Sequence, residues 1–193
     1  QEVNQVVIAP LAVSLMIAAG AIVLRNSKWI RYWSGFGVLG YTVSVTYLVA
    51  RVGFQKTLTF QAGSWTAPYG ITLVADSLTS LMLLITAVVS LSSLIYSHNL
   101  VEESGIFNVF MHFMVAGMTG AFLAGDLFNL FVWLEVTLMS SYVMVSFYGG
   151  RKETYTTLKY VAINLIGSSL MLISIGGLYS VTGTLNIADI GLR

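Results

Sequence analysis

Charged residues are scarce in this 193-residue chain, and cysteine is absent. Only 9% of the residues are Asp, Glu, Lys or Arg, whereas a typical soluble domain carries about 25%. This scarcity excludes a solvated globular domain, and the lack of cysteine excludes disulfides, iron–sulfur ligation and thiolate zinc sites made by this chain. The formal net charge of +1 gives no basic surface for nucleic acid. With two separated histidines and no cysteine, we expect no cofactor and no metal site.

The chain is rich in long apolar runs, since 56% of its residues are hydrophobic. Six of these runs are long enough to cross about 30 Å of hydrocarbon at about 1.5 Å per residue. They span approximately residues 3–24, 30–52, 73–96, 106–124, 127–148 and 157–181. We therefore predict an all-α polytopic membrane protein in which residues 1–193 form a single transmembrane domain.

The connection over residues 53–72 is the longest one. It is rich in Gln and Thr, with a partial strand-like alternation that ends in the turn residues Gly63, Pro68 and Gly70. The pattern indicates a partly strand-like segment followed by turns.

Basic residues predict the orientation of the chain. Arg25, Lys28 and Arg31 lie between the first two runs, and Arg151 and Lys152 lie between the last two. Positively charged connections stay on the cytoplasmic side. Both connections are therefore predicted to be cytoplasmic.

Glu135 is the most informative residue, because it lies near the middle of the apolar run at 127–148. An ionised side chain at the centre of a bilayer costs about 3 kcal/mol on insertion scales. A carboxyl group kept neutral by burial and a site that takes up and releases protons are both consistent with this position. Intramembrane acids are functional by default, so we predict that Glu135 is a proton-translocation site.

Lys159 is the predicted partner of Glu135. Alone, a lysine about one turn inside a membrane helix reaches back to the headgroups as often as it finds a partner. The acidic residue on the preceding run favours pairing. In such a pair, protonation of one member changes the proton affinity of the other.

His112 is a weaker relay candidate in the run at 106–124. Its imidazole could pass protons, and a hydrogen-bonded packing histidine is an equal alternative. Asp76 and Asp126 precede apolar runs and are predicted to cap helices. Gly117 and Gly125 belong to a stripe of small residues that predicts close helix packing.

Two stretches carry a resemblance to a known family. GDLFNLFVWLEVTLMSSYVMVSFYGG and LKYVAINLIGSSLMLISIGGLYSVTGTLNIADI resemble the antiporter-like subunits. These are the D-type membrane proteins of Mrp sodium/proton antiporters, their counterparts in membrane-bound hydrogenases of archaea, and the large antiporter-like subunits of respiratory complex I. GSWTAPYGITLVADSLTSLM is similar to the Mrp D-type version in particular.

The resemblance implies a fold and a site. Family members have about fourteen transmembrane helices in two inverted repeats, each with a broken helix that forms a proton half-channel. Glu135 matches the glutamate of the fifth helix, and Lys159 followed by Tyr160 matches the lysine pattern of the sixth. The family's glutamate pairs with a lysine on the broken seventh helix. That helix is absent before Arg193, so the chain resembles the N-terminal part of such a protein.

We therefore expect a multi-pass subunit of a Na+/H+ antiport complex in a prokaryotic cytoplasmic (plasma) membrane. Its partners would be other membrane subunits, the lipid bilayer, H+ and Na+. It would move protons through a Glu/Lys relay and have no catalytic chemistry of its own. One alternative is an ion-pumping membrane-arm subunit of a redox complex, such as a membrane-bound hydrogenase or a complex I relative, which would make it part of an oxidoreductase. Another alternative is a non-conducting scaffold fragment.

Overall fold

The computed structural model describes residues 5–53, 56–65, 67, 69–100, 105–147 and 149–192. Within these residues, six helices are long and apolar enough to span a membrane, which confirms the predicted all-α polytopic class. They are α1 (Gln5–Leu24), α2 (Ile30–Val52), α3 (Ser77–Leu100), α4 (Gly105–Leu123), α5 (Leu127–Ser146) and α6 (Arg151–Thr182).

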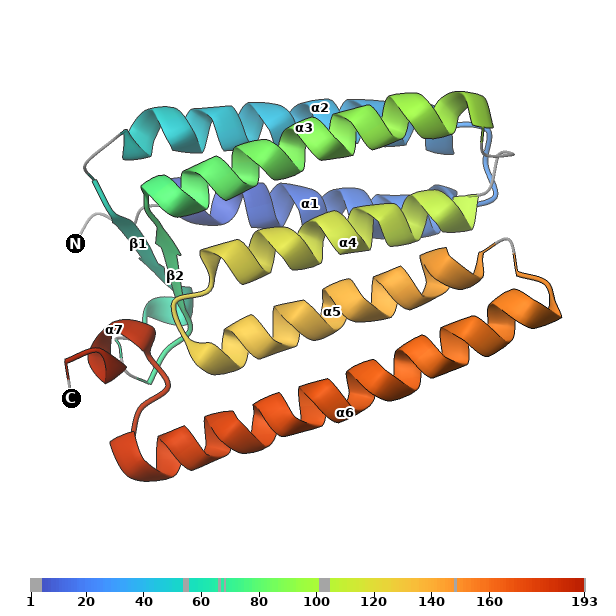
Figure 1. Cartoon of the computed structure of the whole chain (residues 1–193). Coiled ribbons are helices and arrows are strands. Elements are labelled where there is room, and N and C mark those ends of the chain that lie inside the picture. Colours follow the sequence, from blue (N-terminus) through green and yellow to red (C-terminus); the bar gives the residue numbers. More distant parts are fainter. Residues whose placement is uncertain are drawn as a thin grey trace.

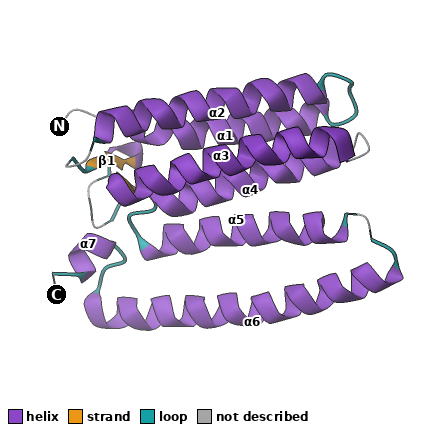
Figure 2. Ribbon diagram, turned by 45° about the horizontal axis from the view of Figure 1, so that its top comes forward, coloured by secondary structure: helices purple, strands orange, loops and turns teal. Residues whose placement is uncertain are grey.

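The helices form a compact group and a thin extension. Helices α1 to α4 make a four-helix bundle, α5 packs on α4, and α6 lies along the outer side of α5 (Figures 1 and 2). The turn between α1 and α2 lies at the same end of the molecule as the first turn of α6 (Figure 1). The apolar core lies inside the bundle and includes Val7, Leu11, Tyr41, Val45, Leu48, Leu83 and Leu123.

Two buried polar contacts join α2 to α4. The Tyr41 hydroxyl lies 2.8 Å from the Thr119 Oγ1, and the His112 Nε2 lies 3.0 Å from the Ser34 Oγ. The partners in each helix are seven residues apart, since 41 − 34 = 7 and 119 − 112 = 7. Because the pairs follow the same order in both helices, α2 and α4 run parallel, and both contacts lie on one seam.

A β-hairpin covers one end of the bundle (Figure 1). Strand β1 (Leu58–Gln61) pairs antiparallel with β2 (Thr72–Ala75), and the short helix α7 (Ile187–Ile190) lies near them. This agrees with the alternation in the long connection. It also corrects the predicted third helix, which begins at Ser77 and not at residue 73, because the residues before it are paired in β2.

Capping residues set several helix boundaries. The Asp76 Oδ1 accepts the Thr79 N–H at 2.8 Å, as predicted for the start of α3. Gly183 ends α6 with φ 68°, a left-handed conformation that glycine adopts without strain. Helix α6 begins six residues before the predicted 157, because its first turns are polar and hydropathy detects only the apolar part.

Candidate functional site

Helix α5 carries Glu135, and Asp126 fixes where the helix begins. The Asp126 Oδ1 accepts the backbone N–H of Asn129 at 2.7 Å, which confirms the predicted cap. Glu135 lies eight residues after the first residue of α5, about 12 Å along the helix axis. Its side chain is partly buried. The carboxyl group is therefore held well inside a membrane-length helix.

Glycines on α4 let α5 approach closely. A Cβ on Gly120 would overlap the indole ring of Trp133, and a Cβ on Gly117 would overlap the side chain of Thr137. Part of the predicted small-residue stripe therefore has a packing role at this contact. Gly125 of the same stripe instead lies against β2, where its N–H donates to the Thr72 carbonyl at 2.8 Å.

A group of polar side chains lies between α5 and α6; we call Glu135, Ser141, Tyr142, Tyr160 and Asn164 the α5–α6 polar cluster. The ring centroids of Tyr142 and Tyr160 are 5.2 Å apart, edge to face, and the Ser141 Oγ lies 3.2 Å from the Tyr160 hydroxyl. The Asn164 side chain lies near the Tyr142 hydroxyl, and Glu135 lies within electrostatic range of it. Tyr142 therefore links the side of α5 that carries Glu135 to the face of α6.

One amide of this cluster has an unused donor. The Asn164 Nδ2 is buried and has no hydrogen-bond partner in the part of the chain that the structure describes. The nearby α5 residue Trp133 also has a buried indole N–H without an acceptor there. The Trp133 ring packs against Gly120 of α4, so its N–H and the Asn164 amide are two separate donors and do not form one site.

Lys159 does not lie in the α5–α6 polar cluster. Its side chain is exposed, and its Nζ lies 4.5 Å from the centre of the Tyr155 ring. Consecutive residues of a helix point in different directions, so Tyr160 faces α5 while Lys159 does not. Among the described residues, no salt bridge joins Lys159 to Glu135. The Glu/Lys pairing stays a prediction.

His112 belongs to the bundle and not to the cluster. It is 2% exposed and contacts Ser34 of α2, whereas Gly117 and Gly120 turn the other side of α4 towards α5. The structure therefore provides a packing partner for this imidazole and does not bring it to Glu135. Its relay role also stays a prediction.

The sequence predicted Tyr160 only as the neighbour of Lys159 in the family's pattern, and it did not point to Tyr142. Tyr160 is followed by Asn164 and Ser168 at intervals of four residues, which places three polar groups on one side of α6. Tyr142 lies seven residues after Glu135 and shares its side of α5. These spacings could have indicated that each helix carries a polar side. That Tyr142 and Tyr160, 18 residues apart, contact each other could be found only from the structure.

Comparisons with known proteins bear on the fold of the chain. The family described as "NADH:quinone oxidoreductase/Mrp antiporter, TM" matches residues 124–193, which contain α5 and α6. The D component of the Na(+)/H(+) antiporter of Alkalihalophilus pseudofirmus is 35% identical over an alignment of 194 positions, which covers 98% of this chain and 39% of that protein.

Two solved structures share the arrangement of the helices. A chain of the membrane-bound sulfane sulfur reductase, an archaeal respiratory membrane complex, has a TM-score of 0.92 and 28% identity, and the match covers 98% of this chain and 40% of that one. A chain of the Mrp complex from Dietzia sp. DQ12-45-1b has a TM-score of 0.81 and 26% identity, and the match covers 93% and 36%.

Six membrane-length helices in this arrangement, with a carboxyl group inside the fifth, define a multi-pass membrane protein with the antiporter-like fold. In sequence and fold the chain is similar to the antiporter-like membrane proteins, among them the D-type proteins of the Na+/H+ antiporters. It spans about two fifths of the length of the relatives that it matches.

Proposed function

We propose that this chain is a membrane subunit of a multi-subunit cation/proton antiporter of the Na+/H+ type, in the cytoplasmic membrane of a prokaryote. Within that complex it moves protons through a relay in which Glu135 takes up and releases the proton and Lys159 responds to its charge. The observation that carries the proposal is the α5–α6 polar cluster, in which hydroxyl and amide groups lie between the two helices on the side of α5 that carries an intramembrane carboxyl.

Glu135 is the centre of the proposed relay because a charged side chain at its depth in the membrane is energetically unfavourable. An ionised carboxylate at this depth costs about 3 kcal/mol unless it has partners or water. The hydroxyl and amide groups of Tyr142, Tyr160 and Asn164 supply polar neighbours on the side of α6. Hydroxyl groups both donate and accept, so a chain of them with water can carry a proton from one end to the other.

Helices α5 and α6 present a largely open surface, which supports further subunits or helices as partners. Only 6% of the residues in the apolar stretch of each helix are buried. Lys159 is exposed on this surface, and a lysine inside a membrane helix needs an acidic or polar partner or a path to the headgroups. We propose that neighbouring helices cover this face and complete the relay around Lys159.

The decisive test is the substitution Glu135→Gln in the assembled complex. The amide keeps the shape of the side chain but cannot take up a proton, so we expect proton flux to fall to the background level. Proteoliposomes with a pH-sensitive dye would report the flux, and subunit stoichiometry would show that the complex is intact. Asp126→Asn is the matched control, because it makes the same carboxylate-to-amide change outside the α5 span and keeps the helix cap.

Unchanged flux in an intact Glu135→Gln complex would overturn the relay and leave the scaffold alternative.

For His112, we expect His112→Gln to lower the flux less than Glu135→Gln, since the imidazole faces α2. If both substitutions abolish flux equally in intact complexes, His112 is a required relay member and this ranking is wrong.

A second candidate function is supported by the archaeal respiratory complex, whose chain has a TM-score of 0.92 with this one. In that case the same Glu135 relay works in the membrane arm of a redox complex, and electron transfer in partner subunits drives it. Purification of the native complex separates the two candidates, because redox subunits with bound metal or flavin support the second and their absence from a transporting complex supports the first.

A further inference from the structure

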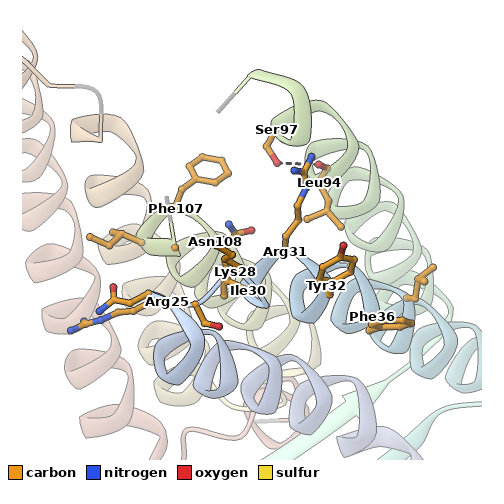
Figure 3. A pocket seen from close by; sticks show the side chains of 16 residues that line it. Arg25, Lys28, Ile30, Arg31, Tyr32, Phe36, Leu94, Ser97, Phe107 and Asn108 are labelled. Atoms are coloured by element: carbon orange, nitrogen blue, oxygen red, sulfur yellow. Dashed lines mark hydrogen bonds between the residues drawn. The ribbon is translucent and has the colours of Figure 1, made fainter. Parts of the chain in front are cut away.

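The end of the molecule that carries the turn between α1 and α2 holds a pocket of about 1010 Å³. It is bounded by this turn, the first half of α2, the last turns of α3 and the first turn of α4 (Figure 3). The pocket lies outside the α5–α6 polar cluster, and the proposed proton relay makes no use of it.

The mouth of the pocket is basic. Arg25, Lys28 and Arg31 contribute to its lining, together with the amide side chains of Asn26 and Asn108 (Figure 3). No Asp or Glu occurs among the lining residues that the structure describes. Guanidinium, ammonium and amide N–H groups are donors that match the oxygens of a phosphate. The chemistry of the mouth is therefore that of an anion site.

The lining also includes apolar side chains, two of them further along α2. Phe36 and Leu39 on α2 and Leu94 on α3 line this part of the pocket. Leu39 lies eight residues beyond Arg31 on the same helix, which is about 12 Å further into the membrane. Phe36 and Leu39 are 74% and 53% exposed, so this side is open laterally, where the lipid chains lie. A ligand that fills the pocket meets cations at one end and hydrocarbon at the other.

Aromatic residues mark the depth of the basic mouth. The rings of Trp29 and Tyr32 lie 5.8 Å apart and both side chains are exposed. Exposed Trp and Tyr collect at the level of the lipid headgroups. The cations of the neighbouring turn therefore lie where lipid phosphates lie, and the apolar lining lies below them.

We propose that this pocket binds an anionic phospholipid, with its phosphate headgroup among Arg25, Lys28 and Arg31 and an acyl chain against Phe36 and Leu39. Basic pockets between transmembrane helices on the cytoplasmic side are a known form of headgroup site. A free phosphate ion would use the same cations but gains nothing from the apolar side. The bound lipid would hold the ends of α2, α3 and α4 together at this face.

The test measures lipid binding to the purified complex that contains this chain, by native mass spectrometry with phosphatidylglycerol and phosphatidylcholine. We expect the double substitution Arg25→Gln/Lys28→Gln to weaken phosphatidylglycerol binding about tenfold or more, with phosphatidylcholine binding unchanged. Arg51→Gln is the matched control, because it removes one cation from the opposite end of α2. Equal preference for phosphatidylglycerol in wild type and double variant overturns the proposal.

A second variant separates a lipid from a free phosphate. Phe36→Ala/Leu39→Ala keeps every cation, so we expect weaker phosphatidylglycerol binding and unchanged binding of inorganic phosphate. If this variant binds the lipid as well as wild type does, and inorganic phosphate displaces the lipid fully, the site takes free phosphate and the lipid proposal is wrong.

The wild-type complex gives an independent measurement if the charge variant does not assemble. The preference for phosphatidylglycerol over phosphatidylcholine must fall as salt concentration rises, because salt screens charges at an open site. A preference that does not change with salt contradicts an electrostatic headgroup site.

Discussion

The bundle of α1 to α4 and the pair α5 and α6 differ in how much of their membrane-length helices they bury within the chain. In the apolar stretches of α1 and α4, 39% and 50% of the residues are buried within the chain, against 6% in α5 and in α6. Two pairs of buried polar groups join helices of the bundle, Tyr41 with Thr119 and His112 with Ser34. The pair α5 and α6 leaves the Asn164 Nδ2 without an acceptor in the described residues. The bundle therefore buries much more of its apolar surface within the chain than α5 and α6 do.

The largest expected difference is in the free energy of unfolding when a glycine of each region is replaced by alanine. An added Cβ at Gly20 in α1 would overlap the Trp33 ring of α2, whereas nothing lies within 4 Å of a Cβ at Gly167 in α6. We expect Gly20→Ala to destabilise the chain by about 1–3 kcal/mol through overpacking. Gly167→Ala should be neutral or stabilising by up to about 1 kcal/mol, because alanine restricts the unfolded chain. Denaturant unfolding in detergent, followed by helical circular dichroism, measures both.

The same glycine pair tests whether neighbours cover α6. If partner helices lie on Gly167, Gly167→Ala should lower the yield of assembled complex while the isolated chain keeps its stability. If Gly20→Ala leaves the unfolding midpoint unchanged, the contact between α1 and α2 is looser than the structure has it, and the contrast between the two regions weakens.

A smaller effect is expected from a pair of tyrosines. Tyr41 is 1% exposed and its hydroxyl contacts Thr119, whereas Tyr179 on α6 is 53% exposed. Tyr41→Phe removes one buried hydrogen bond, which contributes about 0.6–1 kcal/mol in membrane helices. Tyr179→Phe should change the unfolding free energy by less than this. The two variants are compared in the same unfolding assay, and equal losses would show that burial does not set the strength of these contacts.

The architecture followed from the sequence because hydropathy and capping are local signals. Six apolar runs gave six helices, and Asp76 and Asp126 gave two helix starts, since a cap acts within three residues of itself. The α5–α6 polar cluster was not found, because it depends on how two helices turn towards each other. The exposure of Lys159 could not be predicted for the same reason. Sequence indicates how deep the residue lies in the membrane but not which way its side chain points.

The smallest expected effect concerns Asp126, which joins the two regions. Burial raises the pKa of its carboxyl above the ordinary 3.8, although the hydrogen bond from the Asn129 N–H opposes the shift. A raised folded-state pKa means that this group favours folding most in acid, and that this contribution is lost as pH rises through the raised value. We therefore expect Asp126→Asn, which keeps a capping oxygen, to be more stable than wild type at neutral pH.

The pH dependence is checked by unfolding midpoints of wild type and Asp126→Asn from acid to neutral conditions. The advantage of the amide should vanish as pH falls towards the ordinary pKa of an aspartic acid. Asp126→Ala separates the charge from the cap, because it loses both and should be less stable by about 1 kcal/mol. An Asn variant that is less stable than wild type at neutral pH would show that the carboxylate charge itself favours the fold.

The backbone contacts beyond the far end of α6 restrict how this helix can move. The Leu127 N–H donates to the Leu185 carbonyl at 3.0 Å, and the Ile187 N–H donates to the Gly125 carbonyl at 3.0 Å. At its other end, α6 is joined to α5 by the short link between Ser146 and Arg151. A slide of one helical turn, about 5.4 Å, would break both hydrogen bonds and strain the link. These contacts therefore oppose any shift of α6 along its own axis and keep the helix in one register against α5.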